Sequence, residues 1–270
     1  MPLQTLRWRS RTEVFVERLD GVELPLVRIP AGVFLMGSPP DEPERSDDEG
    51  PQHQVQLTEF LMGQTPITQA QWRAVMDNNP SQFADQPDSD QRPVEHVSWS
   101  DAMAFCQRLS ERTGRYYTMP SEAQWEYACR AGTSTAFHFG GTLTTELANH
   151  KGGQTTPVRM FPANAWGLHD MHGNVWEWCL DHWHGNYEGA PTDGSAWLNT
   201  QDTNTGPATK GGNSAPSRNT KGLRLLRGGS WNDLPRDCRS AYRGDDEPGS
   251  ASVDFGFRVV CLPQDPSLNT

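Results

Sequence analysis

The sequence predicts an α+β fold that is built from short strands, a few helices and much irregular loop. Composition is the first observation, because the 270 residues include 25 Gly, 21 Pro and 10 Trp, which is typical of a loop-rich chain with an aromatic core. The second is that short alternating apolar stretches are bounded by Gly and Pro, whereas helical periodicity is confined to three segments. The apolar share of 34%, with glycine added, is that of an ordinary globular protein, so disorder is not predicted.

Short strands are predicted in the first quarter of the chain. The stretch Val14–Val16 has an alternating pattern, which predicts the first strand. Residues 24–36 predict a pair of strands that is interrupted at Pro30 and Gly32, because proline and glycine break regular pairing. Residues 53–61 alternate again and predict one further strand.

The organisation of the chain predicts one main domain. Residues 1–23 are interpreted as a lead-in segment, residues 24–262 as the domain and residues 263–270 as a tail. Residues 39–52 are acidic and rich in proline, which predicts a solvated loop. Residues 187–221 are polar and rich in Gly and Thr, and predict a surface insertion.

Three helices are predicted from their start signals. A Ser or Thr that is followed three residues later by Gln can satisfy two backbone amides that a helix N-terminus leaves unpaired. The two clear cases and a weaker third are residues 72–76 after Thr68 and Gln71, residues 125–130 after Ser121 and Gln124, and residues 101–112 after Ser98, ending at Gly114.

Charge and targeting signals exclude several classes of function. The net charge of -11 and the pI of about 5.1 disfavour nucleic acid and anionic membranes as partners, because phosphate binding needs clustered Lys and Arg. The first residues contain no apolar signal-peptide region, and no window has the length of a transmembrane helix. The five cysteines are odd in number and irregularly spaced, so we expect reduced thiols and a cytoplasmic protein.

The most informative stretch lies near the C-terminal end. Two apolar, glycine-bearing blocks, Leu226–Trp231 and Gly256–Cys261, bracket residues that have no apolar periodicity. A segment that is anchored at both ends predicts a surface displayed by a scaffold, over residues 231–255. We expect Trp231, Arg243 and Phe257 to be buried. The side chains that we expect to point outward are Asn232, Asp233, Leu234, Arg236, Asp237, Tyr242, Asp245, Asp246 and Asp254. The predicted ligand-binding residues are Trp231, Asn232, Asp233, Leu234, Arg236, Asp237, Tyr242, Gly244, Asp245, Asp246, Glu247, Ser250, Ser252 and Asp254.

Seven motifs in a fixed order resemble one family. The chain resembles the formylglycine-generating (sulfatase-modifying factor) enzyme family, and this resemblance implies that family's variant of the C-type lectin fold, with small twisted antiparallel sheets and two main helices. Fold alone does not determine activity. The motifs are residues 29–38, 66–72, 92–99, 119–127, 173–178, 227–231 and 256–258.

The resemblance implies that the family's enzymes bind copper(I) through two cysteines, and this pair is missing here. Counted forward from Ser230, the first family cysteine falls on Asp233 and the second on Cys238. Counted backward from residues 256–258, Cys238 drops off the second position as well. Only one thiol lies within residues 232–256, and a single thiolate is a poor copper(I) site. We therefore expect no copper and no enzymatic activity.

The same C-terminal stretch also resembles the variable region of proteins that are diversified by retroelements. Those proteins use a C-type lectin fold to display mutable side chains. We therefore expect a protein that binds a protein or other ligand through residues 232–254, and we expect it to be a monomer. The alternatives are a copper-dependent oxidase that converts a sulfatase cysteine to formylglycine, and a non-catalytic accessory domain of a larger signalling system. The residues implied to hold the frame are Gly228, Gly229, Ser230, Arg239, Ser240, Ala241, Arg243 and Phe257.

A structural calcium site is implied by the motif around Gly173. In the family's calcium loop, two carboxylates and two backbone carbonyls surround the ion, and oxygen ligands suit calcium. The alternative is that the carboxylates bond only to the loop backbone. The implied ligands are Asp170, Gly173, Val175 and Glu177, and a second, weaker site would use Asn149 and the carbonyl of His150.

Overall fold

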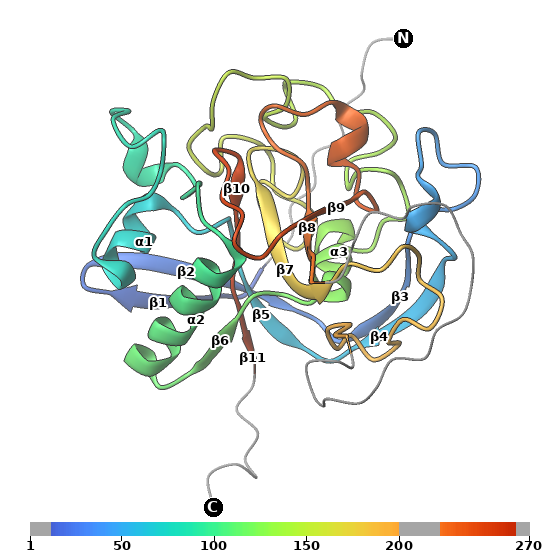
Figure 1. Cartoon of the computed structure of the whole chain (residues 1–270), viewed down its shortest axis with the longest axis horizontal. Coiled ribbons are helices and arrows are strands. Elements are labelled where there is room, and N and C mark those ends of the chain that lie inside the picture. Colours follow the sequence, from blue (N-terminus) through green and yellow to red (C-terminus); the bar gives the residue numbers. More distant parts are fainter. Residues whose placement is uncertain (1–11, 200–221, 263–270) are drawn as a thin grey trace, which may run out of the picture.

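The computed structural model describes residues 12–199 and 222–262, and its largest element is a five-stranded antiparallel sheet. The strands lie in the order β1-β2-β5-β11-β6, so the last strand of the chain is inserted between strands from its first half (Figure 1). Their bounds are β1 Val14–Leu19, β2 Val22–Ile29, β5 Phe60–Gly63, β6 Tyr116–Thr118 and β11 Val260–Leu262.

A second sheet of four strands carries the C-terminal segment. The order is β10-β7-β8-β9, with β10 parallel to β7 and the other pairs antiparallel. Because β9 and β10 lie at opposite edges, residues 247–254 must cross the width of the sheet between them. In Figure 1 the labels β10, β7, β8 and β9 follow one another across this sheet. The bounds are β7 Trp176–His182, β8 Arg224–Arg227, β9 Arg243–Asp246 and β10 Phe255–Gly256.

Two predicted boundaries in the first quarter were wrong. Residues 53–61 form two strands, because β4 (His53–Leu57) pairs with β3 (Gly32–Met36) in a separate two-stranded sheet, whereas β5 joins the five-stranded one. The interpreted lead-in also belongs to the fold: β1 pairs along its whole length with β2, and residue 24 lies inside β2. Residues 200–221 of the predicted insertion and the tail 263–270 lie outside the described residues.

The three predicted helices are confirmed, and their caps form as the capping boxes indicate. In each helix, the hydroxyl of the Ser or Thr at the N-cap accepts a hydrogen bond from the backbone amide three residues later. The side chain of that later residue accepts the backbone amide of the N-cap residue in return. The α helices are α1 Gln69–Met76, α2 Trp99–Thr113 and α3 Glu122–Arg130. Short 3-10 helices are η1 Asp47–Glu49, η2 Ser89–Gln91 and η4 Pro235–Cys238.

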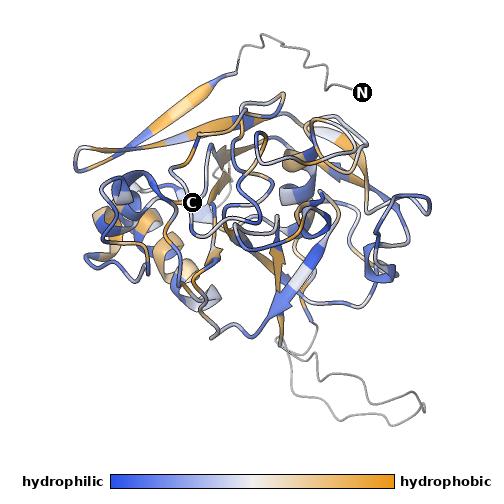
Figure 2. Ribbon diagram, turned by 90° about the horizontal axis from the view of Figure 1, so that it is seen from above, coloured by the Kyte–Doolittle hydropathy of each residue, from blue (hydrophilic) through white to orange (hydrophobic). Residues whose placement is uncertain are grey.

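The core lies on both faces of the five-stranded sheet. Helices α1 and α2 contribute to a cluster on one face, in which Trp72 stacks on Phe105 with 5.5 Å between ring centroids. Helix α3 contributes to the cluster on the other face, around the fully buried Trp125. The hairpin of β1 and β2 is largely apolar along its length, as the orange ribbon beside the N-terminal trace in Figure 2 shows. All five cysteines are buried and unpaired. Among the described residues, none of the helices has the length and hydropathy needed to cross a membrane.

Candidate functional site

Buried arginines hold residues 231–255, which we call the display segment, in place. The first, Arg227 at the end of β8, is 0% exposed and donates from Nη2 to Glu126 of α3 at 2.6 Å. Its guanidinium also donates to the carbonyls of Ser240 at 2.6 Å and Ala241 at 2.9 Å. A charge can be buried at tolerable cost only when it is paired and hydrogen-bonded. Both Nη atoms of Arg227 are held in this way by α3 and by the segment itself, whereas its Nε atom is buried without a hydrogen-bond partner among the described residues.

The second arginine corrects the prediction for residues 39–52. Arg239 is 2% exposed and bonds to Glu42 at 2.6 Å and to Glu49 at 2.5 and 2.8 Å. Both carboxylates are buried, so this acidic loop is not simply solvated. Burial acts to raise the pKa of Glu49, but the Arg239 guanidinium outweighs it and holds that pKa below its usual value.

Two further arginines complete the frame. Arg243, on β9, bonds to Glu122 of α3 at 2.7 and 3.2 Å, and both side chains are buried. Arg258, just after β10, forms a bidentate pair with Glu177 of β7 at 2.5 and 2.6 Å. Four buried arginines, two of them flanking the display segment and two inside it, therefore tie its backbone to α3, β7 and the acidic loop.

The turn that opens the display segment depends on two glycines. Gly228 and Gly229 have φ of +96° and +68°, a region that favours glycine. A Cβ atom at Gly229 would lie 2.6 Å from the sulfur of Cys238, which leaves no space for a side chain. Ser230 follows fully buried. All eight residues that were implied to hold the frame are buried in the structure.

The structure divides the predicted ligand-binding residues into two groups. Asn232, Leu234, Arg236 and Glu247 are exposed, whereas the other ten are partly buried. The expectation of an outward side chain was wrong for Asp233, which accepts the amide and hydroxyl of Ser230 at 2.9 and 2.5 Å. It was wrong for Asp254 as well, which lies 3.2 Å from the same hydroxyl and accepts that of Ser252 at 2.5 Å. The remaining partly buried positions are Trp231, Asp237, Tyr242, Gly244, Asp245, Asp246, Ser250 and Ser252.

The position that the resemblance assigns to copper holds one thiol in an unfavourable state. Cys238 is 0% exposed. Burial, with a smaller contribution from the carboxylates of Asp233 and Asp237, raises the pKa of this thiol well above its usual value. Since the thiolate is the form that binds metal, the described residues offer no thiolate at this position near neutral pH.

The implied calcium loop fits an ion on one side only. Asp170 is 8% exposed, and its Oδ1 atom is buried without a hydrogen-bond partner among the described residues. Burial raises the pKa of Asp170 to about 6, because the charged form is poorly compensated. Glu177, by contrast, is already neutralised by Arg258 and also accepts the indole N–H of Trp125 at 2.7 Å. The loop therefore offers one free carboxylate oxygen instead of two carboxylates.

Asn149, from the second implied site, is held in place by neighbouring loops. The carbonyl of Asn149 accepts the amide of Asn174 at 2.9 Å, and its side-chain amide donates to Gln154 at 3.0 Å. The ring nitrogens of His150 are buried without hydrogen-bond partners in the described part of the chain. No group of three or more His, Cys, Asp or Glu in residues 12–199 and 222–262 is arranged to hold a metal.

Sequence reasoning missed a loop that packs beside the display segment. The ring of Phe83 meets that of Trp231 edge to face, with centroids 5.8 Å apart and an interplanar angle of 81°. Glu95 is 0% exposed and accepts the amides of Gln82 and Phe83 at 3.1 and 3.0 Å, which fixes the loop. No local pattern in the sequence indicates this contact, since about 150 residues separate the two rings.

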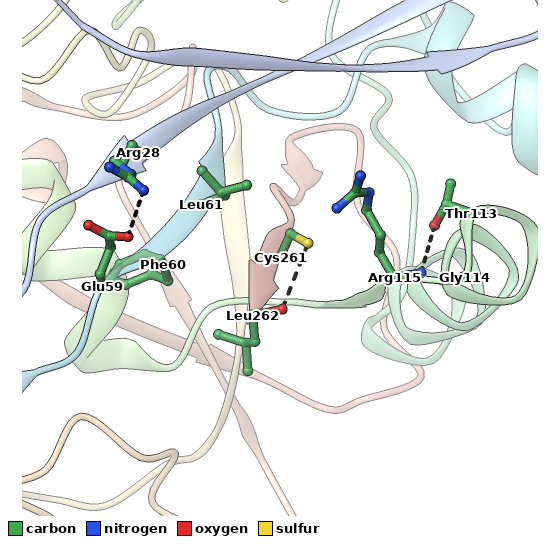
Figure 3. Close-up of a pocket in the computed structure, with 9 residues that line it drawn as sticks. All are labelled: Arg28, Glu59, Phe60, Leu61, Thr113, Gly114, Arg115, Cys261 and Leu262. Carbon is green, nitrogen blue, oxygen red and sulfur yellow. Dashed lines mark hydrogen bonds and ion pairs between the residues drawn. The ribbon is translucent and has the colours of Figure 1, made fainter. Parts of the chain in front are cut away.

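Two cavities lie away from Trp231. One of about 550 Å³ is found between Arg28, Leu61, Cys261 and Arg115, beyond the end of α2 (Figure 3). No predicted site residue lines it, and Arg28 is already paired with Glu59 at 3.2 Å. Another of about 450 Å³ lies between the acidic loop and η4, where Pro235, Arg236 and Arg239 form part of its wall.

Proteins that are similar to this chain in sequence include protein kinases and formylglycine-generating enzymes. It is 30% identical to the serine/threonine-protein kinase Pkn1 of Chlamydia caviae, over 87% of this chain but only 37% of that protein. It is 27% identical to the formylglycine-generating enzyme of Thermomonospora curvata, over 88% of this chain and 93% of the enzyme. The chain thus spans less than half the length of the chlamydial kinases that it matches.

Two solved structures are similar to the chain over most of its length. PvdO from Pseudomonas aeruginosa superimposes with a TM-score of 0.78 and 31% identity, over 95% of this chain and all of that one. Variable protein 1 of Treponema denticola superimposes with a TM-score of 0.73 and 28% identity, over 93% and 99%. The α+β, C-type lectin-like fold of the formylglycine-generating enzyme subtype is confirmed. Residues 18–262 match the sulfatase-modifying factor enzyme 1-like domain, and the chain belongs to that family.

Proposed function

We propose that this protein is a non-catalytic member of its family that binds a ligand through the display segment. The observation that carries the proposal is the separation of two sets of side chains in one segment. Arg227, Arg239, Arg243 and Arg258 are buried in ion pairs that fix the backbone. Asn232, Leu234, Arg236 and Glu247 are exposed between them. A surface whose backbone is fixed by other residues can bind with little loss of conformational entropy.

The chemistry of Cys238 supports the absence of catalysis. A copper(I) site of the family's kind needs two thiolates, but residues 232–256 contain a single buried thiol whose pKa is raised. We expect the purified protein neither to bind copper(I) tightly nor to oxidise a Cys-x-Pro-x-Arg peptide. The assay is copper titration with a competing chelator, followed by mass spectrometry of the peptide after aerobic incubation. Copper-dependent conversion of the peptide to an aldehyde would refute the proposal and restore the oxidase alternative.

We further propose that the segment is diversified by a retroelement. The similarity to a protein named variable protein 1, at 28% identity over 93% of this chain, supports this. The test is the DNA beside the coding region. A reverse-transcriptase gene with an adenine-substituted copy of codons 226–258 is expected there, and an intact genomic neighbourhood without either would contradict diversification while leaving ligand binding open.

The accessory-domain alternative has one observation in its favour. The chlamydial kinases carry a region similar to this chain within proteins more than twice as long.

We propose that the protein works as a cytoplasmic monomer that contacts neither nucleic acid nor membrane, with the accessory role as the competing proposal. Light scattering of the purified chain, together with its elution when mixed with duplex DNA or anionic vesicles, tests the proposed state. A dimer or co-elution would contradict it.

A further inference from the structure

We propose that the display segment is one wall of a wider binding surface, centred on Phe83 and Trp231, and that this surface binds a basic segment of a polypeptide. The inference rests on the proposed function, which it extends in two ways. It adds a second wall, residues 81–85, from the first half of the chain, and it names the chemical class of the ligand.

The aromatic pair supplies the apolar centre. Both rings are partly exposed and meet edge to face at 5.8 Å. The indole N–H of Trp231 donates to the carbonyl of Val253 at 3.4 Å, so the ring is held by the 81–85 loop and by the crossing segment together. Partly exposed aromatic rings that are fixed in place supply much of the binding energy in protein interfaces.

The second wall is formed before any ligand arrives. The fully buried carboxylate of Glu95 accepts two successive amides, those of Gln82 and Phe83, and its own amide donates to the hydroxyl of Ser81 at 3.2 Å. These bonds fix the loop from beneath and leave Phe83 at the surface. A rigid wall of this kind contributes contact area without an ordering cost on binding.

The charge of the surface selects a basic partner. The display segment contains six carboxylates, and of its three arginines Arg239 and Arg243 are neutralised in buried ion pairs. Asp233 and Asp254 both lie within hydrogen-bond distance of the Ser230 hydroxyl, which has one proton to donate. Among the described residues no Lys or Arg forms an ion pair with either carboxylate.

A Lys or Arg side chain of a partner satisfies both features. Its charge complements the net negative charge of the display segment, which has six carboxylates and three arginines, and an Arg guanidinium stacks favourably on an indole ring. The net negative charge of the display segment repels phosphates, which argues against nucleic acid or an anionic lipid surface as the occupant. Charge complementarity of this kind also accelerates association and selects against acidic partners.

The test is selection from a random dodecapeptide library against the immobilised full chain, followed by calorimetry with the selected peptides. We expect peptides with net positive charge, whose affinity falls when NaCl rises from 50 to 300 mM. Phe83→Ala should weaken them at least tenfold, whereas Leu35→Ala, at an exposed position of β3, should not change them. Hydrogen exchange gives a second measure that needs no variant, because peptide binding should protect the amides of residues 82–85.

The outcomes separate the two proposals. If selected peptides require Trp231 but are acidic or neutral, or neither respond to Phe83→Ala nor protect residues 82–85, the wider basic-ligand surface is refuted and the display function stands. If no peptide is selected, or the selected ones bind Trp231→Ala as tightly as the wild type, both proposals fail. Scrambled peptides of the same composition should bind more weakly, and equal binding would reduce the effect to net charge and overturn the inference.

Discussion

Residues of the same type that lie close together in this sequence differ greatly in their burial and in their ion pairs. Arg236 and Arg239 lie three positions apart in η4 and in its C-cap. The side chain of Arg236 is 52% exposed, whereas that of Arg239 is 2% exposed. Only the second has carboxylate partners in another part of the chain, Glu42 and Glu49.

This difference predicts opposite effects of the same substitution. Arg239→Ala should lower the free energy of unfolding by about 3–5 kcal/mol, because it leaves two buried carboxylates unpaired. Arg236→Ala should change it by less than about 0.5 kcal/mol, as is usual for exposed side chains. Urea denaturation followed by tryptophan fluorescence measures both. A loss of under 1 kcal/mol for Arg239→Ala would mean that the acidic loop does not depend on this pair.

Asp170 provides a prediction that combines pH and calcium. Its pKa is raised from 3.8 to about 6 by burial, so the carboxyl stabilises the fold fully below its ordinary pKa, and this stability is lost as pH rises through about 6. The difference corresponds to about 3 kcal/mol at pH 7. Without calcium, Asp170→Asn should therefore be more stable than the wild type at pH 7.5 and lose this advantage near pH 4.

Calcium should reverse this order if Asp170 binds the ion, as the resemblance to the family's calcium loop implies and as we propose here for its one free carboxylate oxygen. The ion binds only the folded state and stabilises it by mass action, so it should raise the melting temperature of the wild type and leave that of Asp170→Asn unchanged. Differential scanning fluorimetry with calcium and with a chelator measures this. A wild-type melting temperature that does not respond to calcium refutes the calcium proposal. Glu177→Ala is a poorer probe, because it also strips Arg258 of its partner.

At the scale of elements, local signals predicted the helices and distant pairings escaped prediction. The three capping boxes determine where α1, α2 and α3 begin, because each box involves residues only three apart. The division of residues 53–61 between two sheets depends on partners elsewhere in the chain, which no local pattern reveals.

The candidate site shows the same limit. The resemblance identified the buried frame of the display segment correctly, but it did not indicate which side chains inside the segment point inward. Asp233 turns toward Ser230 because a buried hydroxyl and amide need an acceptor. The partners of Arg239 lie about 190 residues away. The one hint of these partners in the sequence was the acidic composition of residues 39–52.

The display segment should therefore tolerate variation unevenly. A library that randomises Asn232, Leu234, Arg236 and Glu247 should express mostly as soluble, folded protein, because these side chains are exposed. A library of equal size at Asp233, Asp237, Tyr242 and Asp254 should yield fewer folded members. The three carboxylates accept hydrogen bonds within or next to the segment, and Tyr242 packs against Trp176 of β7. Sorting by a folding reporter compares the two. Equal yields would show that the inward contacts contribute little to stability.

At the scale of the whole molecule, the arrangement of the five-stranded sheet ties the two ends of the chain together. Strand β11 pairs with β5 on one side and β6 on the other, so the sheet is continuous only when β11 is present. Val260 is fully buried in it and Cys261 nearly so. Both follow the display segment directly in the sequence.

A chain that ends at Gly256 should consequently fail to fold. It lacks Phe257, Arg258 and β11, so one buried aromatic, the partner of Glu177 and the strand that joins β6 to the rest of the sheet are lost together. A chain that ends at Leu262 retains every described strand and serves as the control. Circular dichroism during heating should show a cooperative transition for the control alone, and a cooperative transition in the shorter chain would contradict this prediction.

The interior position of β11, between β5 and β6, has a consequence for how errors in the display segment are handled during synthesis. The ribosome makes the segment before it makes β11, so a premature stop or a frameshift within codons 231–255 removes the strand that completes the sheet. Such a product cannot bury its core and is left to proteases. Only chains that have been read through the entire segment in frame acquire the native fold, so the topology itself acts as a proofreading step on whatever sequence the segment carries.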